Sequence, residues 1–175
     1  MGNESIPSSE VDCINTREQY RTPVVDAVDK PLRQDSRYYD LLPIMASMQS
    51  LTVTPPHSQN EVLAFCSTIQ QQLYSLRSRM TKSTTDECCV LSALVYVDAI
   101  ILNKSFKALL KSSVNVQLQA AIQQSTRAGE MNDRKEILDW ITTSAAIGIS
   151  SNRNHRVILI DKFKAVVALL EKVCI

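Results

Sequence analysis

The stretch DECCVLSALVYVDAIIL, residues 86–102, decides the fold, because it is the most apolar segment of the 175-residue chain. Thirteen of the fifteen residues from Cys88 to Leu102 are apolar, and only Ser92 and Asp98 break the run. A strand of this length would be unusual. A membrane-spanning helix needs about 20 apolar residues, and Asp98 would lie inside it. The pattern therefore predicts a central helix that is surrounded by other helices.

The residues just before this segment indicate where the central helix begins. Thr84 and Glu87 form the T-x-x-E pattern of a capping box, in which side chains satisfy the free backbone N–H groups of the first turn. Asp86 adds a negative charge that favours the same helix end. Ser58 and Glu61 repeat the pattern earlier in the chain, so a second helix is expected to start there.

Apolar residues at spacings of three and four predict further helices on both sides of the central one. We expect an all-α, multi-helix bundle of about five or six helices over residues 38–175, after a disordered N-terminal tail over residues 1–37, which is polar and interrupted by prolines. In the central helix, the apolar rhythm carries on through NKSFKALLKS. The expected helices are residues 38–51, 58–80, 84–112, 113–129, 133–150 and 155–174. The expected stripe of the second helix is Val62, Phe65, Ile69, Leu73, Leu76 and Met80.

Composition excludes several classes of function. Three glycines in the whole chain cannot form the G-x-G-x-x-G or Walker-type loops that bind nucleotides. A net charge of +1 gives no overall field that would attract nucleic acid or an acidic membrane. Five scattered cysteines, with no secretory signal at the N-terminus, favour an intracellular, reducing compartment.

The sequence offers few groups for chemistry, and we expect no catalytic, cofactor-binding or metal-binding residues. Cys88 and Cys89 are adjacent, so on a helix they point about 100° apart and are poorly placed to share one metal ion. His57 and His155 lie in polar surroundings. Asp98 is the one charge in an apolar setting, and its expected role is structural, with Lys162, Arg134 or a tyrosine hydroxyl as partner.

Three further features receive structural interpretations. Trp140 lies on the same helical face as neighbouring isoleucines and is expected in the core. Tyr96, beside Asp98, is the other polar group expected to face inward. The basic residues near the C-terminus lack interleaved aromatic side chains, apart from one apolar phenylalanine, so we expect a solvated face rather than direct nucleic-acid binding. These basic residues are Arg153, Arg156, Lys162 and Lys164.

Two segments resemble a known family. CCVLSALVYVDAIILNKSF, residues 88–106, resembles the long central helix of the fungal-specific transcription factor domain, in which small and apolar residues precede a core of the A-L-x-Y-x-x-x-I-L type. ILDWITTSAAIGISSNRNHRVILIDKFKAVV, residues 137–167, is similar to a later stretch of that family, where a tryptophan-containing helix leads through small residues and a polar loop into a helix with buried aromatics. The resemblance covers roughly residues 58–175.

The resemblance implies an all-α regulatory domain of the kind found in zinc-cluster transcription factors. The six-cysteine cluster that binds DNA in that family is missing, since Cys13 is the only cysteine before Cys66. We therefore expect a non-enzymatic nuclear regulator, present in the nucleus or in both nucleus and cytoplasm, that contacts itself or a full-length transcription factor and regulates a fungal metabolic gene cluster. Two alternatives stay open: a helical interaction or scaffold module unrelated to transcription, and an accessory protein of a biosynthetic pathway.

Overall fold

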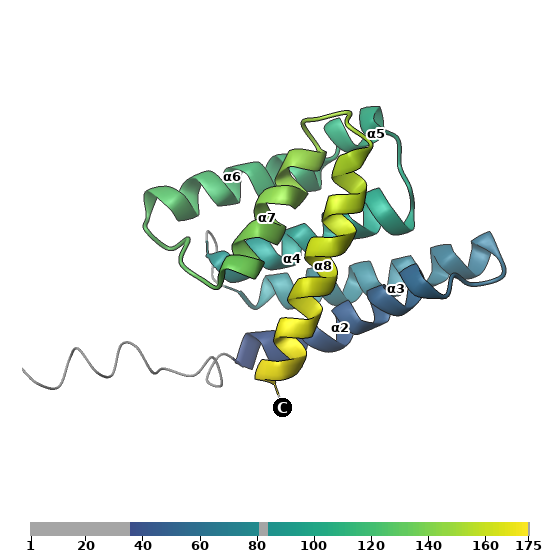
Figure 1. The fold of residues 1–175 in the computed structure, drawn as a ribbon, viewed down its shortest axis with the longest axis horizontal. Coiled ribbons are helices and arrows are strands. Elements are labelled where there is room, and N and C mark those ends of the chain that lie inside the picture. The colour runs from purple at the N-terminus through teal and green to yellow at the C-terminus, as the bar shows by residue number, and fades with distance from the viewer. Residues whose placement is uncertain (1–35, 81–83, 175) are drawn as a thin grey trace, which may run out of the picture. The chain divides into compact units, whose positions relative to one another are not determined.

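The computed structural model describes residues 36–80 and 84–174, and in these residues every regular element is helical (Figure 1). The predicted all-α fold is confirmed, with seven α-helices and one π-helical turn in the described part of the chain. The tail expected over residues 1–37 falls outside the described residues except at its end, because the first described helix begins at Ser36. The elements are α2 (Ser36–Val53), α3 (Gln59–Ser78), α4 (Thr85–Tyr96), η3 (Val97–Ile101), α5 (Phe106–Leu110), α6 (Ser113–Arg127), α7 (Lys135–Ile147) and α8 (Asn154–Val173).

Helix α4 lies at the centre of the fold, as its composition predicts. Every residue from Cys88 to Ala99 is buried, and α4 packs against α2, α3, α6 and α7. Full burial of each large apolar side chain contributes about 1.5–3 kcal/mol, so this helix supplies much of the driving force for folding. No described helix is both long enough and apolar enough to cross a membrane.

The central helix ends earlier than the sequence pattern predicts. Residues 97–101 form a π-helical turn, closed by a hydrogen bond from the Leu102 backbone N–H to the Val97 carbonyl (2.9 Å). Asn103 then adopts a left-handed conformation, with φ of 47°, which stops the helix. Ser105 starts the separate helix α5 by accepting a hydrogen bond from the backbone N–H of Ala108. The predicted continuation through residues 103–112 is therefore wrong.

The core of the C-terminal half is an aromatic cluster. The rings of Tyr96 and Phe163 are stacked with centroids 4.0 Å apart, and Trp140 packs against Phe163 with centroids 6.0 Å apart. All three side chains are almost fully buried. The contacts join α4, α7 and α8, and they confirm the predicted core position of Trp140.

The helix ends agree only in part with the sequence signals. Ser58 and Thr84 cap α3 and α4 as predicted, since each hydroxyl accepts a hydrogen bond from a backbone N–H three residues later. Gly129 ends α6 with φ of 72°, the left-handed conformation that glycine adopts without strain. The helix expected from residue 133 begins at Lys135, and Asp133 accepts hydrogen bonds from the Tyr38 hydroxyl and from the backbone N–H of Arg134.

Helices α6 and α7 approach closely where α7 ends. Gly148 lies against the buried side chain of Asn115, and a β-carbon at position 148 would be 2.1–2.2 Å from its amide atoms. The Gly148 backbone itself, with φ of −78° and ψ of −10°, suits any residue. Glycine is required here for space and not for conformation.

Candidate functional site

The α2–α3 hairpin carries an uncharged, partly apolar hollow on its surface. Helix α3 buries Cys66, Ile69, Leu73 and Leu76 against the bundle. Ile69, Leu73 and Leu76 of the predicted stripe are buried as expected, whereas Phe65 is 53% exposed. Phe65 therefore belongs to the surface of the hairpin and not to its core.

Phe65 lines a groove between the two helices, which we call the α2–α3 groove. It encloses about 550 Å³ and combines apolar side chains with hydroxyl and amide groups. None of its lining residues is charged. Ile69 forms part of its base, since that side chain is buried. The lining residues are Ser47, Ser50, Leu51, Thr54, Pro56, Phe65, Thr68, Ile69 and Gln72.

A second hollow continues the groove along the hairpin. It encloses about 470 Å³ and shares Thr68 and Gln72 with the first. Its far end carries both signs of charge, Asp40 from α2 and Arg79 from the C-terminal end of α3. The uncharged groove thus lies near the hairpin turn, and the two charged residues lie at the opposite end of the hairpin.

Further apolar side chains are exposed near the turn of the hairpin. Val53, at the end of α2, is 68% exposed, and Leu63, in the second turn of α3, is 51% exposed. In Figure 1 this end of the hairpin extends beyond the other helices. Leu63 is two residues from Phe65, about 200° around the helix, and so lies on the other flank of α3. The projecting end therefore exposes apolar surface on more than one side.

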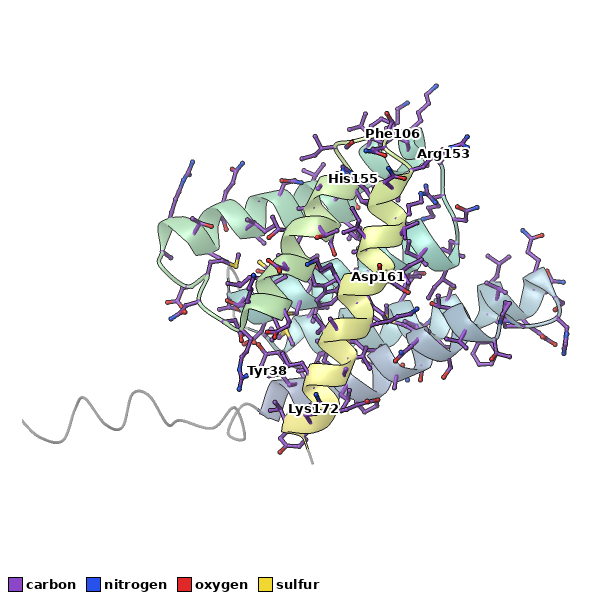
Figure 2. All side chains as sticks on the ribbon, in the orientation of Figure 1. Tyr38, Phe106, Arg153, His155, Asp161 and Lys172 are labelled. Carbon is purple, nitrogen blue, oxygen red and sulfur yellow. The ribbon has the colours of Figure 1, made fainter. Side chains whose placement is uncertain are left out.

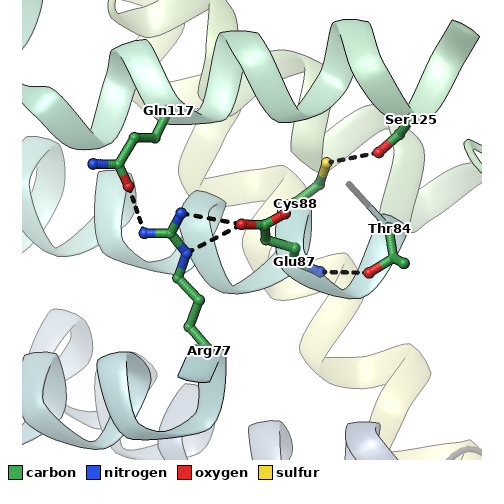
Figure 3. Close-up of polar contacts among 6 residues, drawn as sticks. All are labelled: Arg77, Thr84, Glu87, Cys88, Gln117 and Ser125. Carbon is green, nitrogen blue, oxygen red and sulfur yellow. Dashed lines mark hydrogen bonds and ion pairs between the residues drawn. The ribbon is translucent and has the colours of Figure 1, made fainter. Parts of the chain in front are cut away.

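A polar cluster fixes the other end of α3 to the bundle (Figure 3). Arg77 donates to one carboxylate oxygen of Glu87 through Nε (3.2 Å) and Nη2 (3.0 Å), and through Nη1 to the Gln117 side chain. The Glu87 side chain is only 8% exposed. A charge with so little access to water needs such a partner, so the cluster holds α3, α4 and α6 in one arrangement.

The cysteines of α4 are placed for packing. Burial raises the pKa of the Cys88 thiol to about 11, and burial also raises the pKa of Cys89 well above its usual range. Cys88 lies 3.9 Å from the Ser125 hydroxyl (Figure 3). A thiol that stays protonated is a poor nucleophile and a poor metal ligand. Across residues 36–80 and 84–174, no three histidine, cysteine or acidic side chains are grouped so that they could hold a metal ion.

Asp98 and Tyr96, the two polar groups predicted to face inward from the central helix, do not meet in one site. Asp98 forms an ion pair with Lys104 (2.7 Å) and accepts a longer hydrogen bond from Gln70 (3.5 Å). The Tyr96 hydroxyl is hydrogen-bonded to Thr52 of α2 (3.0 Å). The structural role expected for Asp98 agrees with these contacts, but the predicted partners Lys162, Arg134 and a tyrosine are wrong.

The C-terminal basic residues are not the uniformly solvated face that the sequence predicts. Arg156 is half-buried and donates to the carbonyl of Ala99 (2.7 Å), so it holds the end of the central helix. Lys162 forms an ion pair with Asp139 of α7 (3.3 Å). Lys164 is exposed, as expected. The sequence carries no local signal for the Arg156 contact, because its partners are more than 50 residues away.

The two histidines differ in their surroundings. His57 is exposed in the turn between α2 and α3. His155 is half-buried in the first turn of α8, and its Nδ1 atom has no hydrogen-bond partner among the described residues. His155 lines a hollow between α7 and α8 together with Asp139, Thr143 and Lys162.

Comparison of the chain with protein-family models, with curated proteins and with solved structures finds no match.

Proposed function

We propose that this protein is a helical regulatory module that acts through protein–protein contacts, and that its contact surface is the α2–α3 groove. The observation that carries the proposal is the uncharged groove with Phe65 half exposed on its wall, on a hairpin that projects from the bundle. Exposed aromatic side chains beside an apolar hollow are typical anchors of protein interfaces.

The partner we propose is a second copy of the same hairpin. A two-fold symmetric interface brings each surface against itself, so every charge near the axis would meet its own copy. The groove has no charged lining residue, which removes that repulsion. Helices of 18 and 20 residues are about 27 and 30 Å long, and two such hairpins pack as a four-helix bundle of ordinary size.

The regulatory part of the proposal comes from the family resemblance. The segment that resembles the central helix of the fungal-specific transcription factor domain is the buried helix α4 and the turn that follows it. By analogy, we propose a nuclear protein that pairs with itself or with a full-length transcription factor and so regulates a fungal metabolic gene cluster. On this proposal, DNA is contacted by the partner and not by this chain.

The rival functions make different use of the same surface. A scaffold module unrelated to transcription would use the groove without entering the nucleus. An accessory protein of a biosynthetic pathway would bind an enzyme there. An enzyme would need polar groups that converge in one pocket, whereas Asp98 and Tyr96 are each engaged with separate structural partners.

Sedimentation velocity over a range of concentrations tests the contact surface. We expect the wild-type chain to form a dimer, and Phe65→Ser to weaken the association about tenfold or more, because an exposed aromatic anchor is lost. Leu63→Ser is the matched control: it removes an equally exposed apolar side chain from the other flank of α3. A monomeric wild type, or equal weakening by both changes, would refute the proposed surface.

Two further measurements separate the regulatory proposal from its rivals. A tagged copy should accumulate in the nucleus, and a mixture with a full-length zinc-cluster relative should form hetero-dimers that Phe65→Ser weakens. Gel-shift measurements on the purified chain should show no sequence-specific DNA complex. Tight, sequence-specific DNA binding by the chain alone would contradict the proposal.

A further inference from the structure

We propose that a second site, at the end of the bundle where α5 meets the start of α8, binds a small organic anion: a carboxylate on an apolar body. The two sides of this pocket are marked by Phe106 and Arg153, which Figure 2 shows at that end of the molecule. We call it the end pocket. It goes beyond the proposed protein contact and shares no lining residue with the α2–α3 groove.

The size and the apolar part of the end pocket suit a small molecule. The pocket encloses about 520 Å³, within the range of about 300–1,000 Å³ that is usual for ligand sites. Phe106, Leu109 and Ile147 supply its apolar surface. Leu109 and Ile147 are each only 3% exposed and belong to the folded core, so the half-buried Phe106 presents most of this apolar surface to a ligand.

The charge of the end pocket is positive and uncompensated. Two arginines, Arg153 and Arg156, line it, and none of the acidic residues that the structure describes does. Arg156 donates to neutral acceptors: the carbonyls of Ala99 and Lys104 and the side-chain oxygen of Asn103. Neither arginine forms an ion pair with any acid of the described residues. These contacts position the guanidinium of Arg156 and leave its charge available to an anion.

The polar side chains around the arginines present donors. The Ser105 hydroxyl accepts a hydrogen bond from the backbone N–H of Ala108 (3.3 Å), and the Ser150 hydroxyl accepts one from Asn152 (3.4 Å). The side-chain oxygen of Asn152 in turn accepts from the backbone N–H of Asn154 (3.0 Å). In each case the protein itself engages an oxygen of the side chain and leaves the O–H or NH₂ hydrogens for another acceptor.

These three properties together define the ligand class. Positive charge and surplus donors match the oxygens of a carboxylate, and the apolar surface beside them matches a hydrocarbon body. A neutral ligand of the same shape would leave the guanidinium charge without a partner. A bare inorganic anion would leave the apolar surface without a partner. The end pocket is therefore expected to prefer an amphipathic monocarboxylate to either one.

Calorimetric titration of the full chain with octanoate tests this site. We expect saturable 1:1 binding below about 10 mM, because a ligand of this size in a matched pocket binds in the low-millimolar range or tighter. Octanamide and inorganic phosphate should each bind at least tenfold more weakly. In heteronuclear NMR spectra, octanoate should shift the signals of Ile147 and Phe106.

Charge-matched variants locate the anion. Arg153→Gln should weaken octanoate binding about tenfold, since Arg153 is exposed and its loss leaves the core intact. Lys164→Gln, an exposed position elsewhere on α8 with the same change in charge, should leave the affinity unchanged. Phe65→Ser should also leave it unchanged, which separates this site from the protein-contact groove.

Four outcomes would overturn the proposal. They are no saturable binding of octanoate, equal affinity for octanamide, equal affinity for phosphate alone, and an Arg153→Gln affinity equal to that of Lys164→Gln. Each removes one of the three properties on which the ligand class depends. None of them bears on whether the α2–α3 groove forms a dimer.

Discussion

Replacement of Gly148 by alanine should change the stability of this protein in opposite directions in two backgrounds. In the wild type, the new β-carbon would be 2.1–2.2 Å from the Asn115 amide, which must move although its side chain is only 6% exposed. Overpacking of this kind costs about 1–3 kcal/mol. Because alanine also restricts the unfolded chain, and the backbone conformation at position 148 suits it, the replacement adds about 0.4–1 kcal/mol to the free energy of unfolding. The net expectation is a loss of about 1–2 kcal/mol.

In an Asn115→Ala background the same replacement should be stabilising. The obstructing amide is gone, so only the gain of about 0.4–1 kcal/mol from the unfolded chain remains. The two measurements therefore differ by about 2 kcal/mol, a coupling energy that only groups in direct contact produce. Asn115→Ala alone removes a side-chain oxygen that has no partner among the described residues, at the expense of a small cavity.

Urea unfolding followed by tryptophan fluorescence measures all four chains of this cycle. Trp140 is the only tryptophan and is fully buried, so its emission reports loss of the core. With a slope of about 2 kcal/mol per molar urea, the expected loss in the wild type lowers the midpoint by about 0.5–1 M, and the expected gain in the Asn115→Ala background raises it by about 0.2–0.5 M. A stabilising effect of Gly148→Ala in the wild type, or an effect of the same sign and size in both backgrounds, would contradict the expected clash with Asn115.

Three other perturbations have expected outcomes. Arg77→Met should lower the free energy of unfolding by about 2–4 kcal/mol, because the buried Glu87 carboxylate loses its guanidinium, and Arg77→Lys should recover part of this in the same urea assay. Burial raises the pKa of Cys88 from 9.0 to about 11, so the thiol of the unfolded chain ionises first as pH rises. The free energy of unfolding should therefore fall by about 2–3 kcal/mol between pH 9 and pH 11, and Cys88→Ala should remove that part of the decline. Arg156→Met should speed hydrogen exchange at the backbone N–H of Lys104 at least tenfold, because the end of the central helix loses the hydrogen bonds that Arg156 donates to it. Exchange in the N-terminal half of α4 should not change.

The fold was predictable where local sequence and burial agree. The T-x-x-E pattern before the apolar run fixed the start of α4, because a capping side chain needs only its own helix. The end of that helix was not predictable in the same way. The apolar spacing of Phe106, Leu109 and Leu110 carries on across Asn103, so the pattern contains no sign of the left-handed residue that divides two helices.

The candidate sites were less predictable, because they depend on contacts between distant segments. The apolar residues of α3 fit a stripe that includes Phe65, yet packing against α2 and α4 buries Cys66 together with the rest of that stripe and leaves Phe65 exposed. Asp98 finds its partner six residues away in Lys104, across a bend that spacing alone does not indicate. Arg156 reaches back more than 50 residues, so its role in the end pocket appears only in the fold.

The π-helical turn at residues 97–101 makes the length of this segment as important as its composition. Such a turn amounts to an α-helix with one surplus residue, which alters the phase of everything that follows by about 100°. Just beyond the turn and Asn103, Lys104 forms its ion pair with the Asp98 carboxylate and its carbonyl accepts a hydrogen bond from Arg156. Apolar exchanges within the turn leave the phase untouched, whereas a one-residue deletion would return the helix to ordinary winding and turn its last residues by about 100° relative to Asp98.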